Sequence, residues 1–213
     1  MAARASRSQA RSRAGARARD IARYMIVFRH ADPRLPFLWE DEAQPPGRWH
    51  GVGEEPAHYF SDTPDGAWGE FLRHEEIRDL EDLATIRRAI WAVEIHDEPA
   101  AISTLRATIQ TGDLESYEAC RTDARRLRKH GATRLDAPSA ALLSNTASGH
   151  VVDGGLRPGP PLQERTIVLY GKRPSLVGWR AASEGQPSRE LLLRVRHFGS
   201  RRYVDNLGAG DIM

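Results

Sequence analysis

Apolar residues recur in short runs along the chain from residue 24 onward. Five of these runs stand out, the first of them rich in β-forming residues: YMIVFR (24–29), AHYFS (57–61), IWAVEI (90–95), TIVLY (166–170) and ELLLRVRHF (190–198). Runs of this length and composition favour strands over helices. The pattern therefore predicts a short strand at each of these five places.

Helical spacing begins at Thr63 and Pro64. Threonine caps the free N–H groups of a first helical turn, and proline fits the first helical position. The apolar residues that follow at helical spacing, and that we expect to face the core, are Trp68, Phe71 and Leu72. A second, shorter helix is predicted at 80–88.

The longest predicted helix covers 114–130, where arginines occupy one face and Gly131 supplies the C-terminal stop. Its apolar stripe consists of Leu114, Tyr117, Cys120, Ala124 and Leu127. A turn follows at Pro138 and Ser139. The segment 32–46, with four prolines, and the Gly- and Pro-rich segment 149–161 both predict loops.

Many short strands and few helices, without strict alternation or an internal repeat, favour an α+β domain with a largely antiparallel sheet. We place this domain at 24–198. Segment 1–23 carries seven arginines and one acid with little apolar surface, so we expect it to be a disordered leader. At the other end we expect a frayed tail at 199–213. The leader is either simply solvated or an arm that binds nucleic acid or another acidic partner.

Composition narrows the class of protein. The only cysteine, Cys120, excludes internal disulfides and thiolate zinc clusters. No run approaches the roughly 18 apolar residues that a membrane-spanning helix requires. We therefore expect a cytoplasmic protein that does not associate with a membrane. Glycine-rich nucleotide loops and the HExxH and GxSxG motifs are missing from the sequence. The histidines His50, His58 and His74 fall on no common face, so we expect no metal.

Five residues are candidates for chemistry: Arg29, Arg48, Tyr59, Glu70 and Ser139. Each also has a purely structural explanation. A strand-end or loop arginine can pair with an acid, and a tyrosine can pack within a strand. A glutamate early in a helix is favoured by the helix dipole, and a serine after a proline can cap a turn.

The motifs around these candidates resemble, in order and spacing, those of the RES domain family. They are FRH (28–30), PGRWH (46–50), HYFSD (58–62), AWGEFLRH (67–74) and RKHGATRLDAPSAAL (128–142). The resemblance spans about 24–198. The departures from the family pattern, which bear on the pose of the substrate, are Pro46, His50, Trp68 and Gly69.

The resemblance implies an ADP-ribosyltransferase-like fold with a mostly antiparallel, split sheet and a few helices. Members of the family degrade NAD, which is their substrate, either by phosphorolysis or by transfer of ADP-ribose. The acceptor is then inorganic phosphate or a protein. Some members are toxins that a helix-turn-helix antitoxin holds inactive, so such an antitoxin is an implied partner, and a second copy of the chain is another.

The chemistry of NAD suits the candidate residues. Arg48 and Arg29 would bind the pyrophosphate through planar guanidinium groups, and Tyr59 would stack on a flat base. Glu70 would stabilise the oxocarbenium-like ribose left when nicotinamide departs, and Ser139 would hydrogen-bond Glu70 or the nicotinamide end. Two other functions stay open: a module that binds NAD or ADP-ribose without catalysis, and a nucleic-acid-associated protein that uses the basic leader.

Overall fold

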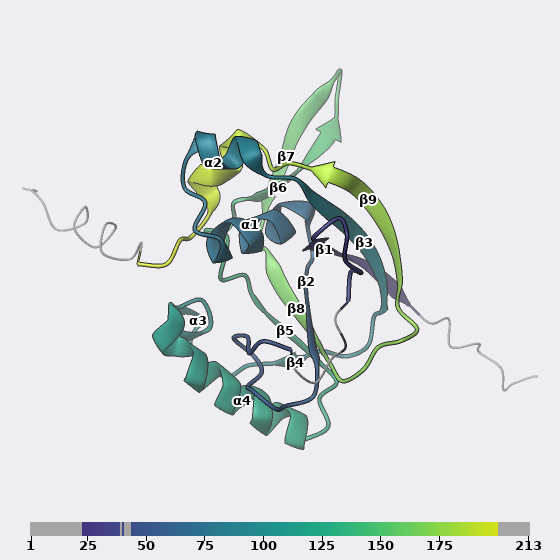
Figure 1. Ribbon diagram of the computed structural model, residues 1–213, viewed down its shortest axis with the longest axis vertical. Helices are drawn as coiled ribbons and strands as arrows, with labels where there is room; N and C mark the ends of the chain where they lie inside the picture. The colour runs from purple at the N-terminus through teal and green to yellow at the C-terminus, as the bar shows by residue number, and fades with distance from the viewer. Residues whose placement is uncertain (1–22, 39, 41–43, 200–213) are drawn as a thin grey trace, which may run out of the picture.

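The computed structural model describes residues 23–38, 40 and 44–199, in a mixed α/β fold with a mostly antiparallel sheet and few helices (Figure 1). This agrees with the predicted α+β class. The predicted leader and tail lie outside the described residues except at Arg23 and Gly199. They stay predictions.

Seven strands form the main sheet in the order β4-β5-β8-β2-β1-β3-β9. Within the described residues only β4 and β5 pair in parallel; every other neighbouring pair is antiparallel. The bounds are β1 Tyr24–Ala31, β2 Ala57–Ser61, β3 Arg88–His96, β4 Ala101–Ile102, β5 Arg134–Pro138, β8 Arg165–Tyr170 and β9 Val177–Gly185.

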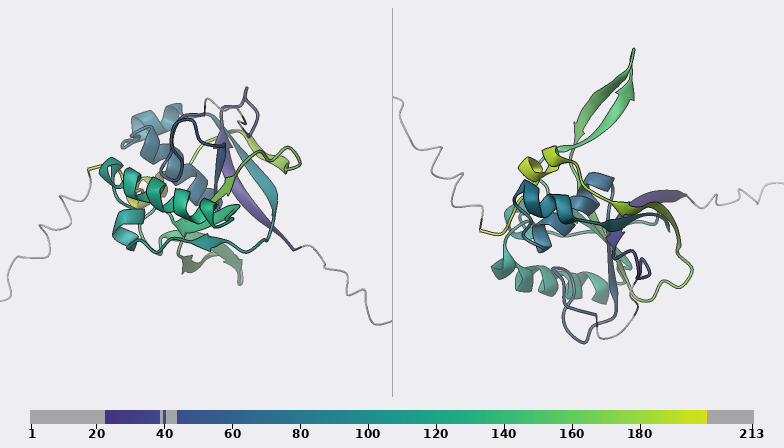
Figure 2. Two further views of the ribbon diagram at one scale, coloured as in Figure 1. Left: turned by 90° about the horizontal axis from the view of Figure 1, so that it is seen from below. Right: turned by 45° about the horizontal axis from the view of Figure 1, so that its top comes forward.

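The helices gather on one side of this sheet, as Figure 2 shows. They are α1 Pro64–His74, α2 Leu80–Thr85, α3 Ala107–Gln110 and α4 Tyr117–Lys129, with 3-10 segments η1 Leu114–Ser116 and η2 Arg189–Arg194. Strand register explains the arrangement. Phe28 lies opposite Ser61 and on the same face as Tyr59, so α1, packed near Phe28, and α4, packed near Tyr59, cover the same face.

Helix α1 begins where the sequence predicts. The Thr63 side chain accepts a hydrogen bond from the Gly66 N–H at 3.1 Å, and Pro64 occupies the first turn. Phe71 and Leu72 are buried in the core between α1, β3 and η2. The N-cap and the apolar stripe thus fix both the start of the helix and the face it turns to the sheet.

The sheet divides between β1 and β2. These strands are registered only at Phe28 opposite Ser61, whereas β1 pairs with β3 along its whole length from Tyr24 to Ala31. Beyond Phe28 the two strands therefore separate. We call this separation of β1 and β2 the split of the sheet.

Segment 149–161, predicted as a loop, is instead a hairpin of β6 Ala147–Val152 and β7 Leu156–Leu162 that projects from the body (Figures 1 and 2). Gly154 and Gly155 form its turn with positive φ values of 62° and 147°. The prolines of β7 are tolerated because a two-stranded ribbon leaves outer N–H groups without ladder partners.

The C-terminal part of the prediction is also wrong. The run 190–198 does not form a strand; most of it lies in η2, where Leu191 is buried and Leu193 is 85% exposed. The last strand is β9 instead, and its mostly exposed side chains give no apolar run to detect. Leu114, placed in the stripe of the long helix, is 63% exposed because the chain there is the 3-10 segment η1.

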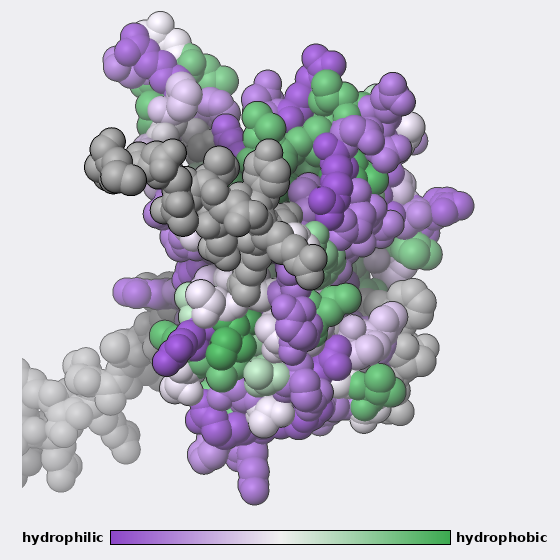
Figure 3. Space-filling view, turned by 90° about the vertical axis from the view of Figure 1, so that its left-hand side faces the viewer, coloured by the Kyte–Doolittle hydropathy of each residue, from purple (hydrophilic) through white to green (hydrophobic). Residues whose placement is uncertain are grey.

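The opposite face of the sheet carries a second apolar core that includes Val27, Phe60 and Ile167, covered in part by Phe37 and Leu38 of the loop after β1. The surface in Figure 3 is mainly hydrophilic, with hydrophobic side chains scattered over it. Among the described residues, no helix combines the length and the apolar character that crossing a bilayer requires.

Candidate functional site

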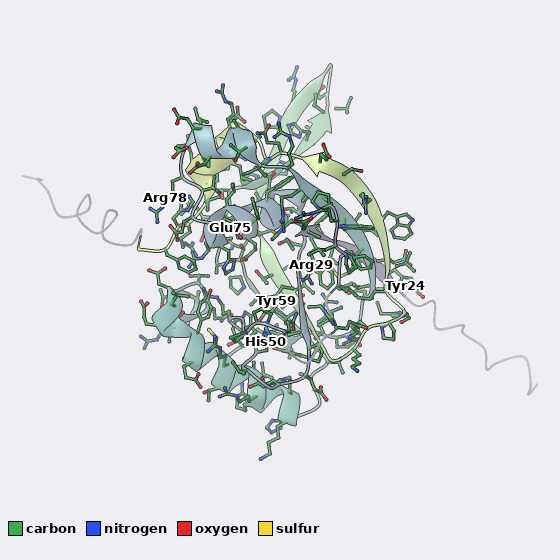
Figure 4. The ribbon with its side chains drawn as sticks, in the orientation of Figure 1. Tyr24, Arg29, His50, Tyr59, Glu75 and Arg78 are labelled. Atoms are coloured by element: carbon green, nitrogen blue, oxygen red, sulfur yellow. The ribbon has the colours of Figure 1, made fainter. Side chains whose placement is uncertain are left out.

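A cavity of about 240 Å³ opens at the split of the sheet, between α1 and α4. Four of the five candidate residues line it: Arg29, Arg48, Tyr59 and Glu70. The wall also includes side chains from α1, α4 and β8, among them His74, Tyr117 and Thr166. In Figure 4, Arg29, Tyr59 and His50 lie in the middle of the molecule between α1 and α4. Segments far apart in the sequence therefore converge here.

Glu70 is held at both carboxylate oxygens. The Thr166 hydroxyl donates to Oε1 at 3.3 Å, and His74 Nε2 lies 3.5 Å from Oε2. Burial raises the pKa of Glu70, but the hydrogen bond and charge of His74 oppose that effect. The positive charges of Arg48 and Arg73 also lower the pKa of Glu70. As a result, this pKa lies below the ordinary carboxyl value. Glu70 is therefore a fixed, ionised carboxylate in a cavity wall.

Arg48 lies in the GRW turn and is only 7% exposed. Its guanidinium donates to the Ser116 hydroxyl at 2.9 Å and to the Gly112 carbonyl at 2.7 Å. The same group lies 4.4 Å from the centre of the Tyr117 ring. These contacts fix a cation in the wall that faces Glu70.

Tyr59 holds the GRW turn. Its hydroxyl accepts a hydrogen bond from the Trp49 N–H at 2.8 Å and lies 3.0 Å from His50 Nδ1. A Cβ atom on Gly47 would lie 2.6 Å from the same hydroxyl, so only glycine fits there. His50, a departure from the family pattern, thus takes part in the turn, and the Tyr59 ring forms part of the cavity wall.

Arg29 lies on β1 where the sheet divides. Its guanidinium is 5.9 Å from the Phe60 ring centre, and its Nη1 is buried without a hydrogen-bond partner among the residues that the structure describes. Burial lowers the pKa of Arg29 to about 10, with no contribution from a neighbouring carboxylate. A cation buried without a counter-ion is costly, and such groups concentrate at binding sites.

Ser139 lies outside the set that lines the cavity, although its neighbours Pro138 and Ala140 belong to it. Its hydroxyl accepts hydrogen bonds from the N–H groups of Ala141 and Leu142, both at 3.2 Å. The side chain is 2% exposed and caps the turn after β5. Of the two contacts expected of Ser139, the hydrogen bond to Glu70 is made by Thr166 instead, and the contact with the nicotinamide end stays a prediction.

Neither a protein-family model nor a curated protein sequence matches this chain. Among solved structures, the chain is similar to one in the crystal structure of the M. tuberculosis MbcT–MbcA toxin–antitoxin complex. The two share 12% sequence identity, with 81% of this chain and 88% of that chain covered and a TM-score of 0.49.

Arg73 does not line the cavity, but its charge acts on Glu70, and sequence reasoning missed it. It is fully buried and donates to the carbonyls of Ala140 at 2.7 Å, Gly112 at 3.1 Å and Arg196. It stands three residues after Glu70 in the quoted AWGEFLRH motif, and an i, i+3 spacing places both on one side of the helix. That spacing was the available signal. No such signal in the sequence indicated the role of Thr166, because Thr166 comes from β8, far from Glu70 along the chain.

Within the described residues, no group of three or more His, Cys, Asp or Glu side chains is placed to hold a metal ion. The titratable residues that meet at the cavity are instead an acid flanked by arginines and histidines. His30 shows the effect of this charge: burial first, then the charges of Arg88 and Arg29, lower its pKa to about 3. His30 is therefore a neutral group at neutral pH.

Proposed function

We propose that this protein cleaves the nicotinamide–ribose bond of NAD, with Glu70 as the catalytic carboxylate. The observation that carries the proposal is one cavity that holds an ionised Glu70 beside Arg48 and Arg29, whose Nη1 has no hydrogen-bond partner among the described residues. A ligand for this site needs negative charge for the arginines and a developing positive charge for Glu70. NAD has both, in its pyrophosphate and in its reacting ribose.

The proposed chemistry needs no acid to protonate the leaving group. The bond between the ribose carbon and the nicotinamide nitrogen breaks with its electron pair on the nitrogen, so nicotinamide leaves neutral. The ribose acquires oxocarbenium character, which a fixed carboxylate stabilises electrostatically. Thr166 and His74 hold Glu70 for this task, and the low pKa of Glu70 keeps it charged. The acceptor oxygen then forms the new bond to the same ribose carbon.

The resemblance to the RES domain supports the same function, because the four candidate residues that line the cavity come from its motifs. It extends the proposal to an ADP-ribosyltransferase-like fold, with phosphate or a protein as acceptor. The resemblance also extends the proposal to a toxin whose toxicity an antitoxin would neutralise. Expression of the chain alone should then stop growth in wild-type form and not as Glu70→Gln. Equal growth arrest by the two forms would contradict a toxin that acts through NAD.

The direct test incubates the purified protein with NAD, with and without inorganic phosphate, and follows nicotinamide release and the mass of the ADP-ribosyl product. Glu70→Gln should fold and lose turnover by roughly a hundredfold or more. Glu75→Gln is the matched control, because Glu75 is an exposed carboxylate that follows α1 directly (Figure 4). Full turnover by Glu70→Gln, or an equal loss in Glu75→Gln, would refute the assignment.

The product identifies the acceptor. Release that depends on phosphate indicates a phosphorylase, and release without phosphate indicates hydrolysis or transfer to a protein. A folded wild-type protein that binds NAD and releases no nicotinamide would replace the enzyme with a binding module.

A further inference from the structure

The segment 196–199, the last that the structure describes, lies against the C-terminal end of α1. In Figure 1 it is the yellow end of the chain that leaves η2. Two backbone hydrogen bonds hold its approach. The Leu143 N–H donates to the Arg194 carbonyl at 2.8 Å, and the Arg196 N–H donates to the Ala141 carbonyl at 2.6 Å. None of the four residues of this segment lines the cavity, so any effect on the cavity passes through the side chains that they contact.

Phe198 contacts two neighbouring side chains of α1. The Arg73 guanidinium lies over its ring, 4.2 Å from the ring centre, as a cation–π pair. The His74 ring meets it edge to face, with ring centres 5.9 Å apart and an angle of 66° between the planes. One half-buried aromatic ring therefore packs on both of the cationic or titratable side chains that α1 presents next to Glu70.

Polar contacts fix the backbone on both sides of the Phe198 ring. The carbonyl of Phe198 accepts from Arg78 Nη2 at 2.9 Å, and the N–H of Gly199 donates to Asp113 Oδ2 at 3.1 Å. The other oxygen of Asp113 accepts from Arg73 Nη2 at 3.3 Å. Asp113 thus ties the end of the segment to the same arginine that the ring covers, and the ring has little freedom to leave α1.

Glu70 is faced by charged or titratable side chains from several elements. They are Arg73 and His74 on α1, Arg48 in the GRW turn, His30 on β1 and Tyr117 on α4. Arg48 and Tyr117 are fixed against each other by their 4.4 Å contact, and His30 is neutral. The His74 side chain, by contrast, is 55% exposed, so its place 3.5 Å from Glu70 depends on what packs against it.

We infer that Phe198 is a positioning residue, whose ring holds His74 and Arg73 in place beside Glu70, so that the docking of segment 196–199 on α1 controls the site. The inference rests on the proposed function, because it concerns the regulation of the same carboxylate. Release of the segment leaves His74 free to turn into solvent and removes the ring that covers the Arg73 guanidinium. Glu70 then loses the contact at one of its two oxygens, while Thr166 still holds the other.

Phe198→Leu tests this role, because leucine keeps the apolar bulk needed for folding and lacks the aromatic faces. Phe198→Tyr keeps the ring and serves as the conservative variant. Leu193→Ala is the matched control, since Leu193 belongs to the preceding segment η2 and is 85% exposed. The first measurement is a carbon-13 NMR titration of the glutamate carboxyl groups in the full chain, in which the signal of Glu70 is the one absent from Glu70→Gln.

We expect Phe198→Leu to raise the pKa of Glu70, because the contact with His74 and the charges of His74 and Arg73 lower it in the wild type. The kcat for NAD should fall roughly fivefold with KM unchanged, since Phe198 does not line the cavity. Phe198→Tyr and Leu193→Ala should both match the wild type.

An unchanged Glu70 titration in Phe198→Leu would overturn the inference. So would an equal shift in Leu193→Ala, which would indicate a general loosening of the C-terminal region, or an equal shift in Phe198→Tyr, which keeps the ring. The NMR titration needs no turnover. If the wild type releases no nicotinamide from NAD, the proposed catalysis fails, and the titration still decides whether Phe198 positions the groups around Glu70.

Discussion

A buried acid under the N-terminus of α1 gives a quantitative prediction about stability. Glu164 is 1% exposed, and its carboxyl group accepts from the Thr63 hydroxyl at 2.5 Å and the Thr63 N–H at 3.4 Å. Burial, aided by the charge of Asp62, raises the pKa of Glu164 from 4.5 to about 9, against the opposing hydrogen bonds from Thr63. The group is therefore protonated in the folded protein at neutral pH.

The sign of the effect on stability follows from proton binding. Between pH 4.5 and 9 the folded state binds a proton at Glu164 that the unfolded state has released, so the free energy of unfolding falls as pH rises. At pH 7 the pH lies about 2.5 units above the unfolded-state pKa of Glu164, and at about 1.4 kcal/mol per unit the cost to stability amounts to roughly 3.5 kcal/mol at most. The cost vanishes below pH 4.5, where both states are protonated.

Glu164→Gln removes this cost, because a glutamine amide resembles the protonated acid. Its oxygen can accept from Thr63, and its N–H groups can donate to Asp62. Urea unfolding at several pH values should show the variant more stable than the wild type at pH 7, by up to about 3.5 kcal/mol, and similar to it near pH 4. Parallel pH profiles for the two proteins would refute the neutral, buried carboxyl.

Three further changes test the site. Gly47→Ala should lower kcat/KM for NAD by roughly a hundredfold, because its Cβ would lie 2.6 Å from the Tyr59 hydroxyl and displace the turn; wild-type kinetics would contradict this. His74→Ala should move the acid limb of the pH–rate profile to higher pH, because the contact lowers the pKa of Glu70; an unmoved limb would contradict it. Arg73→Met should destabilise the fold by about 3 kcal/mol in urea unfolding, since it leaves buried carbonyls without donors; an unchanged midpoint would argue against that role.

Hydrophobic patterning predicts the elements whose side chains are buried. Strand β2 and the start of α1 follow the sequence closely, because an apolar run and an N-cap threonine each act locally. Strand β9 was missed because it lies at a sheet edge, where most of its side chains face solvent and carry no apolar pattern. The hairpin of β6 and β7 was missed because glycines and prolines that signal a loop also suit an isolated two-stranded ribbon.

The residues of the site divide in the same way. Glu70, Arg48 and Tyr59 could be nominated because short motifs surround them, but their partners could not. Thr166, which donates to Glu70, is 96 positions away along the chain, and the Ser116 hydroxyl that holds Arg48 is 68 positions away. Such pairs depend on strand order and on where the sheet divides, which no local pattern encodes. Ser139 shows the reverse case, where a motif residue serves the turn that carries it.

The Gly112 carbonyl connects these features. It accepts from Arg48 at 2.7 Å and from Arg73 at 3.1 Å, so one acceptor before α4 joins the GRW turn to α1. The shared carbonyl therefore links the two elements through one acceptor. It also brings two guanidinium groups close to Glu70, where their charges help to offset the effect of burial on its pKa. The interactions that hold the two sides of the cavity together thus also keep its carboxylate ionised.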